Sequence, residues 1–249
     1  MKTIRLPYFN ERNAKIDSII IHCLAYDVEN AVESFKQNEV SPHYLIDERG
    51  KVYHFVDDKK RAWHAGKSFW QGKTDLNDCS IGIELCSKSF GQEAYPLGQM
   101  KALISLCQRL KRKYHIKKER ILGHSDISPL RKADPGKAFP WAYLARHNLG
   151  VWYDVRNAAK FEENNLAMLL ENIGYDVSDM KAAKTAFVRH YMGKCVEDDT
   201  LENLLQKPEN TPVKVDEEEF IRVLKAVAYS FLDKKMLDLS KKVMYNKRS

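Results

Sequence analysis

The stretch "IDSIIIHCL", residues 16–24, decides the fold of the first half of this chain. Its β-branched residues follow one another without alternation, which is typical of a central strand that is covered on both faces. His22 is the polar residue near the end of this run. The stretch therefore predicts a buried strand that ends at a histidine.

Four further signals flank this strand. "VENAVESFKQN" (28–38) spaces its apolar residues like one face of a short helix, and "PLGQMKALISLCQRLKRKYHI" (96–116) carries a longer apolar helical stripe. "HYLIDERGKVYHFV" (43–56) is typical of a hairpin, and "SIGIEL" (80–85) alternates as a strand does. Strands interleaved with helices predict an α/β or α+β domain over residues 1–149.

The strand signals fade after Gly150. Residues 161–177 and 179–192 read as two helices, and Gly174 is expected to end the first of them. We therefore expect a small helical domain over residues 150–206.

The last part, residues 207–249, is predicted to be a linker and a C-terminal amphipathic helix. "KPENTPVKVD" (207–216) carries prolines typical of a linker, and Asp216 is a candidate N-cap. The helix is expected from Phe220 to about Met244.

Charge is unevenly distributed along the chain. The formal net charge is +7, and residues 1–149 contain 25 lysines and arginines against 17 acidic residues. This surplus indicates an anionic partner, either a nucleic acid or a substrate with carboxylates, or else a solvated basic surface. No aromatic-basic groove or DNA-reading motif is visible, so we expect no nucleic-acid partner.

Five scattered cysteines lack any CxxC spacing, which argues against a disulfide framework and favours a reducing compartment. The first residues, "MKTIRLPYFNERNAK", show no apolar secretory segment, and no apolar run approaches the ~20 residues of a transmembrane helix. We expect a cytoplasmic protein without a transmembrane segment.

The stretch "LGHSDISPLRKADPGKAFPW" (122–141) is too rich in breakers for a helix, and it holds His124 and Asp134 around one turn. The residues before this turn, "RILGH" (120–124), are expected to form a strand that ends at His124, and His22 lies at the predicted end of another strand. Two imidazoles and a carboxylate are ligands that zinc accepts when it keeps a fourth position for water. An ordinary polar loop is the alternative.

Two further residues fit hydrolysis of a carbonyl compound. Glu84 lies on the non-aliphatic face of its strand, where an ionised carboxylate is expensive to bury without a partner. It is a candidate to take a proton from a metal-bound water and deliver it to a leaving amine. Lys132 is a candidate to stabilise an oxyanion, or is a plain exposed loop lysine.

Five motifs, "IIIHCL", "HYLIDERGKVYHFV", "KKRAWHAG", "LNDCSIGIEL" and "ILGHSDISPLRKADPG", occur in the order and at roughly the separations seen in zinc-dependent N-acetylmuramoyl-L-alanine amidases. The chain most resembles the branch with the AmpD and AmiD enzymes, over nearly all of residues 16–141. The resemblance implies a central mixed β-sheet flanked by helices, followed by a small all-α domain. It also implies one zinc ion per chain on His22, His124 and Asp134, with Glu84 and Lys132 as catalytic residues.

The activity implied by the resemblance is cleavage of the amide between the lactyl group of N-acetylmuramic acid, including its 1,6-anhydro form, and L-alanine of the stem peptide. The expected partners are muropeptides or the sacculus, and the oligomeric state stays open. The alternative is a non-catalytic peptidoglycan-recognition protein, which would be marked by loss of a zinc ligand. All three ligand positions are filled here, which favours the enzyme.

Three residues within the family motifs are candidates for substrate binding. Trp63 and His64, in "RAWHAG", are groove residues near the metal or packing elements, and Asn77 contacts substrate or holds a turn. Pro42 stands where some distant relatives carry a catalytic tyrosine, which makes Glu84 more important.

The helices after Gly150 resemble the small peptidoglycan-binding-like module of AmiD-type enzymes, whereas residues 216–249 lie outside both resemblances. A bundle that only packs on the catalytic domain is the other interpretation of these helices. A wall-binding module would favour a location in the periplasm or cell envelope, reached by a non-classical route.

Overall fold

The central strand of the fold is β3 (Ser18–Leu24), and all seven of its residues are buried. The computed structural model describes residues 1–194 and 215–232. Within them, six strands form one sheet in the order β1-β5-β4-β9-β3-β10. The other strands of this sheet are β1 (Lys2–Thr3), β4 (Tyr44–Ile46), β5 (Val52–His54), β9 (Ser80–Cys86) and β10 (Ile121–Gly123).

The sheet is mixed, as expected. β3 pairs in parallel with β9 and β10, and β4 pairs in parallel with β9. The predicted hairpin is present, because β4 and β5 are antiparallel around a turn that starts at Asp47. Two short ribbons complete the strands: β2 (Phe9–Glu11) pairs with β6 (Lys60–Ala62), and β7 (Phe69–Trp70) with β8 (Lys73–Thr74).

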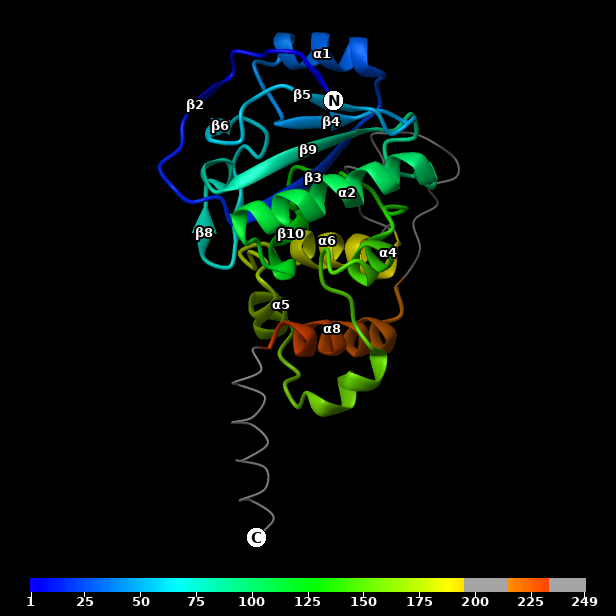
Figure 1. The fold of residues 1–249 in the computed structure, drawn as a ribbon. Coiled ribbons are helices and arrows are strands. Elements are labelled where there is room, and N and C mark those ends of the chain that lie inside the picture. Colours follow the sequence, from blue (N-terminus) through cyan, green and yellow to red (C-terminus); the bar gives the residue numbers. More distant parts are fainter. Residues whose placement is uncertain (195–214, 233–249) are drawn as a thin grey trace.

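Helices cover both faces of the sheet (Figure 1). α2 (Leu97–Tyr114) packs on the face that presents Ile19, Ile21 and the isoleucines of β9. The opposite face has two covers. α1 (Val28–Gln37) packs over Leu24 and Leu45, whereas the C-terminal helices pack over Ile20 and Leu122.

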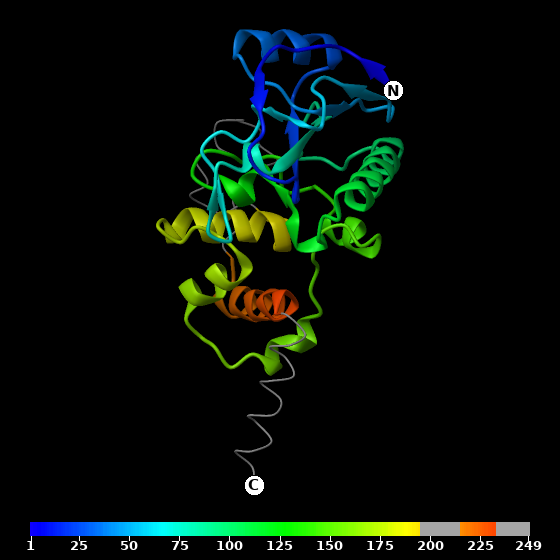
Figure 2. The ribbon, with the colours of Figure 1, turned by 60° about the vertical axis from the view of Figure 1, so that its left-hand side comes forward.

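The C-terminal part is helical, as expected. It contains the 3-10 helix η3 (Val155–Lys160) and the helices α5 (Leu166–Ile173), α6 (Met180–Met192) and α8 (Glu217–Phe231). Figure 2 shows these helices together at one end of the molecule, away from α1. Gly174 follows α5 with φ of 136°, and the side chain of Asp216 caps α8 by accepting the N–H of Glu219.

Two sequence expectations need correction. β10 ends at Gly123, and His124 begins the short helix α3 (His124–Ile127), because the carboxylate of Asp126 turns back to accept the Gly123 N–H. α8 ends at Phe231, because Leu232 is extended, and the rest of the helix expected to about Met244 lies outside the described residues.

Residues 195–214, with most of the predicted linker and the end of the 150–206 region, lie outside the described residues, as do residues 233–249. The division of the chain at residues 149/150 and 206/207 stays a prediction. The remaining short elements are η1 (Leu76–Asp78), η2 (Lys118–Arg120) and α4 (Trp141–Arg146).

Candidate metal centre

The candidate centre lies in the gap between the two helical covers of one sheet face. His22 on β3 and Glu84 on β9 are register partners, so their side chains leave the sheet on the same face. On this face Ile20 is covered by the C-terminal helices and Leu24 by α1. His22 therefore lies where neither group of helices covers the sheet.

Three donor atoms converge at this place. The Nδ1 atoms of His22 and His124 are 2.9 Å apart, and Oδ2 of Asp134 is 3.3 Å from the first and 3.1 Å from the second. All three residues are at most 4% exposed. A tetrahedral zinc ion with bonds of about 2.0–2.1 Å separates its ligand atoms by about 3.3 Å, so the donor set fits zinc in kind and in spacing.

Short-range contacts hold the turn that carries His124 and Asp134. The backbone N–H of Ser125 donates to the carbonyl of Asp134 across the turn at 2.9 Å. Gly136, with φ of 85°, lies directly against Gly91, where a side chain on either glycine would collide with the other segment. This close approach explains why the turn needs glycine after Pro135.

Electrostatics favour a neutral imidazole at His22 and an ionised carboxylate at Asp134. Burial, followed by the neighbouring His124, lowers the pKa of His22 to about 4. Burial alone would raise the pKa of Asp134, but the two imidazoles hold it well below its usual range. These are the protonation states in which His22 and Asp134 can bind a cation.

Glu84 lies beside the three donors with an unsatisfied carboxylate. Its Oε2 atom is buried and has no hydrogen-bond partner among the described residues. Burial, reinforced by the negative charge of Asp134, raises the pKa of Glu84 well above its usual range, and Lys132 partly opposes this. A carboxyl group with a raised pKa in a cleft is suited to accept and return a proton.

A cleft of about 630 Å³ opens onto this centre. One wall comes from α1 and the residues after it, including Phe35 and Pro42, and the other from the turn that carries Lys132 and Asp134. Glu84 lines the cleft between these walls. The predicted metal ligands and both predicted catalytic residues are therefore brought together.

The structure places the three candidate binding residues differently. Trp63 lines the cleft, is 36% exposed and donates its indole N–H to Asn10. His64 also lines the cleft, with Nδ1 3.0 Å from Nε2 of His22. Asn77 is only 6% exposed, and its Oδ1 accepts the backbone N–H groups of His64 and Ala65. Asn77 thus holds the backbone of residues 64–65 in place, which corresponds to the structural one of its two predicted roles.

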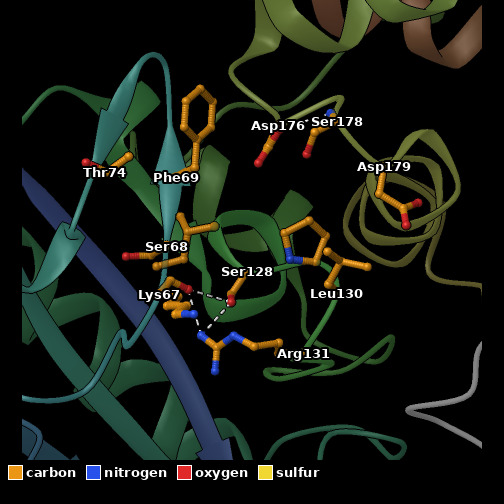
Figure 3. A pocket seen from close by; sticks show the side chains of 12 residues that line it. Lys67, Ser68, Phe69, Thr74, Ser128, Leu130, Arg131, Asp176, Ser178 and Asp179 are labelled. Atoms are coloured by element: carbon orange, nitrogen blue, oxygen red, sulfur yellow. Dashed lines mark hydrogen bonds between the residues drawn. The ribbon is translucent and has the colours of Figure 1, made fainter.

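A second, smaller cavity of about 300 Å³ lies next to the cleft (Figure 3). Arg131 and Ser128 point to one wall of it and share the backbone carbonyl of Lys67, at 2.6 and 2.8 Å. Asp176 and Asp179 lie across it, between α5 and α6. Arg131 lines both cavities. Its hydrogen bond to the carbonyl of Lys67 connects the residues after His64 to the turn that carries Lys132.

Sequence analysis missed two residues at the centre. The carbonyl of Ala65 lies 3.2 Å from Nε2 of His124, and the Ser80 hydroxyl lies 3.3 Å from Nε2 of His64. A backbone carbonyl carries no signal in the side-chain pattern. Ser80 could have been noticed, because it lies on the same strand face as Glu84.

A buried His-His-Asp set beside a proton-accepting carboxyl group, in a cleft at the ends of parallel strands, is typical of metal-dependent hydrolases. Comparison with known proteins narrows this class. Residues 12–137 match the N-acetylmuramoyl-L-alanine amidase family model. The chain belongs to this family, as its motifs predicted.

Named relatives agree with this membership. The N-acetylmuramoyl-L-alanine amidase AmiD of Escherichia coli K12 is 34% identical over 187 residues, covering 66% of this chain and 68% of that protein. The 1,6-anhydro-N-acetylmuramyl-L-alanine amidase AmpD of Haemophilus influenzae is 42% identical over 163 residues, covering 56% of this chain and 88% of that protein.

Solved structures show the same fold, including its helical C-terminal part. E. coli AmiD, bound to the substrate anhydro-N-acetylmuramic acid-L-Ala-D-gamma-Glu-L-Lys, aligns with a TM-score of 0.69 at 28% identity, covering 88% of this chain and 91% of that one. AmpDh3 of Pseudomonas aeruginosa, in complex with an anhydromuramic pentapeptide, aligns with a TM-score of 0.71 at 25% identity. The alignment covers 94% of this chain and 100% of that one.

Proposed function

We propose that this chain is a zinc-dependent N-acetylmuramoyl-L-alanine amidase that releases stem peptide from 1,6-anhydro muropeptides. The observation that carries the proposal is the convergence of Nδ1 of His22, Nδ1 of His124 and Oδ2 of Asp134 within 3.3 Å. The anhydro sugar is favoured because the AmiD and AmpDh3 structures named above each hold an anhydromuramic peptide.

One zinc ion would be held by these three side chains. When bound, zinc would polarise the scissile carbonyl and lower the pKa of the attacking water. Glu84 takes the proton of the attacking water on its unsatisfied Oε2 and returns it to the amine of L-alanine as the amide breaks. The ammonium group of Lys132, from the other side of the cleft, stabilises the negative charge on the former carbonyl oxygen.

The cleft has room for the sugar, the lactyl group and the first residues of a stem peptide. Trp63 offers an aromatic face on its wall, next to His64. The basic surplus of residues 1–149 suits the carboxylates of the stem peptide. The supported partners are therefore muropeptides, and the described helices include none that could cross a membrane.

The proposed compartment is the cytoplasm. Its support is the state of the cysteines: Cys79, Cys86 and Cys107 are buried and form no disulfide among the described residues, which suits a reducing environment. Cell fractionation that places the protein in the periplasm would contradict this part of the proposal.

The test is incubation of the purified chain with 1,6-anhydro muropeptides, reducing-end muropeptides and intact sacculi, with and without a chelator. We expect mass spectrometry to show free stem peptide, produced fastest from the anhydro form, lost with chelator and restored by zinc. Binding of muropeptides without any release would instead support the non-catalytic recognition protein.

A further inference from the structure

We propose that one short segment, His64–Ala65, sets which ring nitrogen of each histidine ligand binds zinc, so that His22 and His124 both present Nδ1 to the metal and keep a hydrogen on Nε2. Ser80 and Asn77 hold this segment and act as positioning residues. The inference rests on the proposed metal site, and it concerns hydrogen bonds that lie behind the ligands.

The first arm begins at the carbonyl oxygen of Leu76, which can only accept hydrogen bonds. The Ser80 hydroxyl lies 2.5 Å from it and therefore donates to it. The oxygen of Ser80 keeps its lone pairs for Nε2 of His64, 3.3 Å away. The hydrogen of the His64 ring is consequently on Nε2.

The tautomer of His64 determines which nitrogen of the candidate ligand His22 donates a hydrogen bond. A neutral imidazole has one N–H and one lone pair, so Nδ1 of His64 is an acceptor. It lies 3.0 Å from Nε2 of His22, which must then be the donor. The remaining nitrogen of His22, Nδ1, is left unprotonated, and this is the atom that faces His124 and Asp134.

The second arm is a single contact. Nε2 of His124 lies 3.2 Å from the carbonyl oxygen of Ala65, which can only accept. His124 can therefore donate from Nε2 when zinc takes the place of the hydrogen that its Nδ1 shares with Oδ2 of Asp134, 3.1 Å away. A ring nitrogen that donates to a carbonyl or another acceptor fixes which nitrogen binds a metal.

The segment that sets both rings is itself anchored. Oδ1 of Asn77 accepts the N–H of His64 at 2.9 Å and that of Ala65 at 2.7 Å. The ring of His64 lies flat on Gly82, where a Cβ atom would come within 2.4 Å of the ring. Because the 64–65 segment serves both ligands, a shift of it disturbs two metal bonds together.

The primary test is the tautomeric state of the histidines in the full chain, read from 15N chemical shifts of the imidazoles with and without zinc. We expect the hydrogen on Nε2 of His22 and His64 in the metal-free protein, and on Nε2 of His22, His64 and His124 after zinc is added. A His64 ring with its hydrogen on Nδ1 would overturn the proposal without any variant.

Variants give a second, independent readout. Ser80→Ala removes the acceptor for Nε2 of His64, and Gly82→Ala pushes the His64 ring from its place. Both should raise the zinc dissociation constant by about 10- to 100-fold, the usual effect of removing a group behind a metal ligand. Ser80→Ala should also add the Nδ1–H form of His64 to the imidazole spectrum.

Matched controls lie nearby. Ser18 is as buried as Ser80 and pairs with it across β3 and β9, but its hydroxyl bonds to Asp17. Gly98 has room for a Cβ, with its nearest neighbour at 3.6 Å. Ser18→Ala and Gly98→Ala should leave zinc affinity unchanged.

The outcomes separate this inference from the proposed function. Wild-type zinc affinity retained in both Ser80→Ala and Gly82→Ala would overturn the positioning role while leaving the amidase intact. A wild-type chain that binds no zinc would overturn the metal site, whereas the imidazole spectrum of the metal-free protein would still decide the tautomers.

Discussion

At the scale of single residues, the centre depends on keeping one carboxyl group unsatisfied. Most buried polar atoms in proteins have a partner, yet Oε2 of Glu84 has none among the described residues, and it faces a cleft that also contains Lys132. A buried carboxyl group without a hydrogen-bond partner lowers the stability of the folded protein, but it is suited to proton transfer. We expect the packing of the surrounding sheet to offset the free energy lost by burying Glu84 in this way.

Replacement of Glu84 by glutamine keeps the shape of the side chain and removes its ability to take a proton. We expect Glu84→Gln to bind zinc like wild type and to lose about 10²- to 10⁴-fold in kcat on an anhydro muropeptide. Metal analysis and steady-state kinetics measure the two effects. The control is Glu93→Gln, the same change at an exposed residue, and near-normal turnover by Glu84→Gln would remove this residue from the mechanism.

At the scale of elements, much of the site could be predicted from local pattern. The strand at residues 16–24 and the alternation at 80–85 correctly placed His22 and Glu84 in a sheet, because burial of strands leaves a direct mark on residue type. The turn from Gly123 to Asp134 was recognised from its breakers, but the expectation that this stretch holds no helix was wrong, because it contains α3. What pattern could not show is the 64–65 segment behind the ligands, since its contacts are backbone atoms from distant loops.

The same limit applies to the contact between the C-terminal helices and the turn that carries His124. Asp126, completely buried, accepts the N–H of Gly123 and the hydroxyl of Tyr175, and lies 2.8 Å from Nδ1 of His190 on α6. Sequence analysis identified neither partner, because residues 49 and 64 positions apart share no local pattern. Through Asp126, the helical part supports the turn from which two of the candidate metal ligands, His124 and Asp134, project.

Tyr175→Phe tests this support with the loss of one hydroxyl. Hydrogen bonds to buried charged groups contribute about 1.5–3 kcal/mol, so we expect the free energy of unfolding in urea to fall by about that amount. Tyr26→Phe, at an exposed position, should have no effect. Equal stability of the two variants would show that the contact between Tyr175 and Asp126 does not contribute to the free energy of unfolding.

Asp17 gives the elements around β3 a pH dependence. It lies between Arg120 and Lys73, and although burial opposes it, hydrogen bonds from Lys73, Ser18 and Arg120 lower the pKa of Asp17 to about 2. A lowered pKa stabilises the folded state above the ordinary pKa of the acid, near 4, and this contribution is lost as the pH falls toward 2.

We therefore expect Asp17→Asn to be less stable than wild type at pH 7, and the difference in unfolding free energy to be smaller at pH 3. Urea unfolding at both pH values measures it. An equal difference at both values would show that the ionised carboxylate is not what Asp17 contributes.

At the scale of the whole molecule, the two parts predicted from the sequence share an apolar core. Ile20 and Leu122 of the sheet lie in one buried cluster with residues of α5, α6 and α8, among them Phe187 and Phe220. The change in pattern after Gly150 correctly indicated helices, but it could not show that they cover a sheet face. This cover forms one side of the gap in which His22 lies.

A shared core predicts cooperative unfolding of both parts. We expect differential scanning calorimetry of the metal-free full chain to show a single transition, with equal calorimetric and van't Hoff enthalpies. Two separate transitions would support independent domains divided near residue 150 and would contradict the shared core.

The most direct test of the account is a zinc titration of the metal-free chain during turnover of a 1,6-anhydro muropeptide, followed by release of stem peptide. The account predicts that activity rises linearly with zinc and saturates at one ion per chain, and that His124→Ala shows neither tight zinc binding nor activity. Release that is independent of zinc, or full activity in His124→Ala, would contradict a metal centre formed by His22, His124 and Asp134.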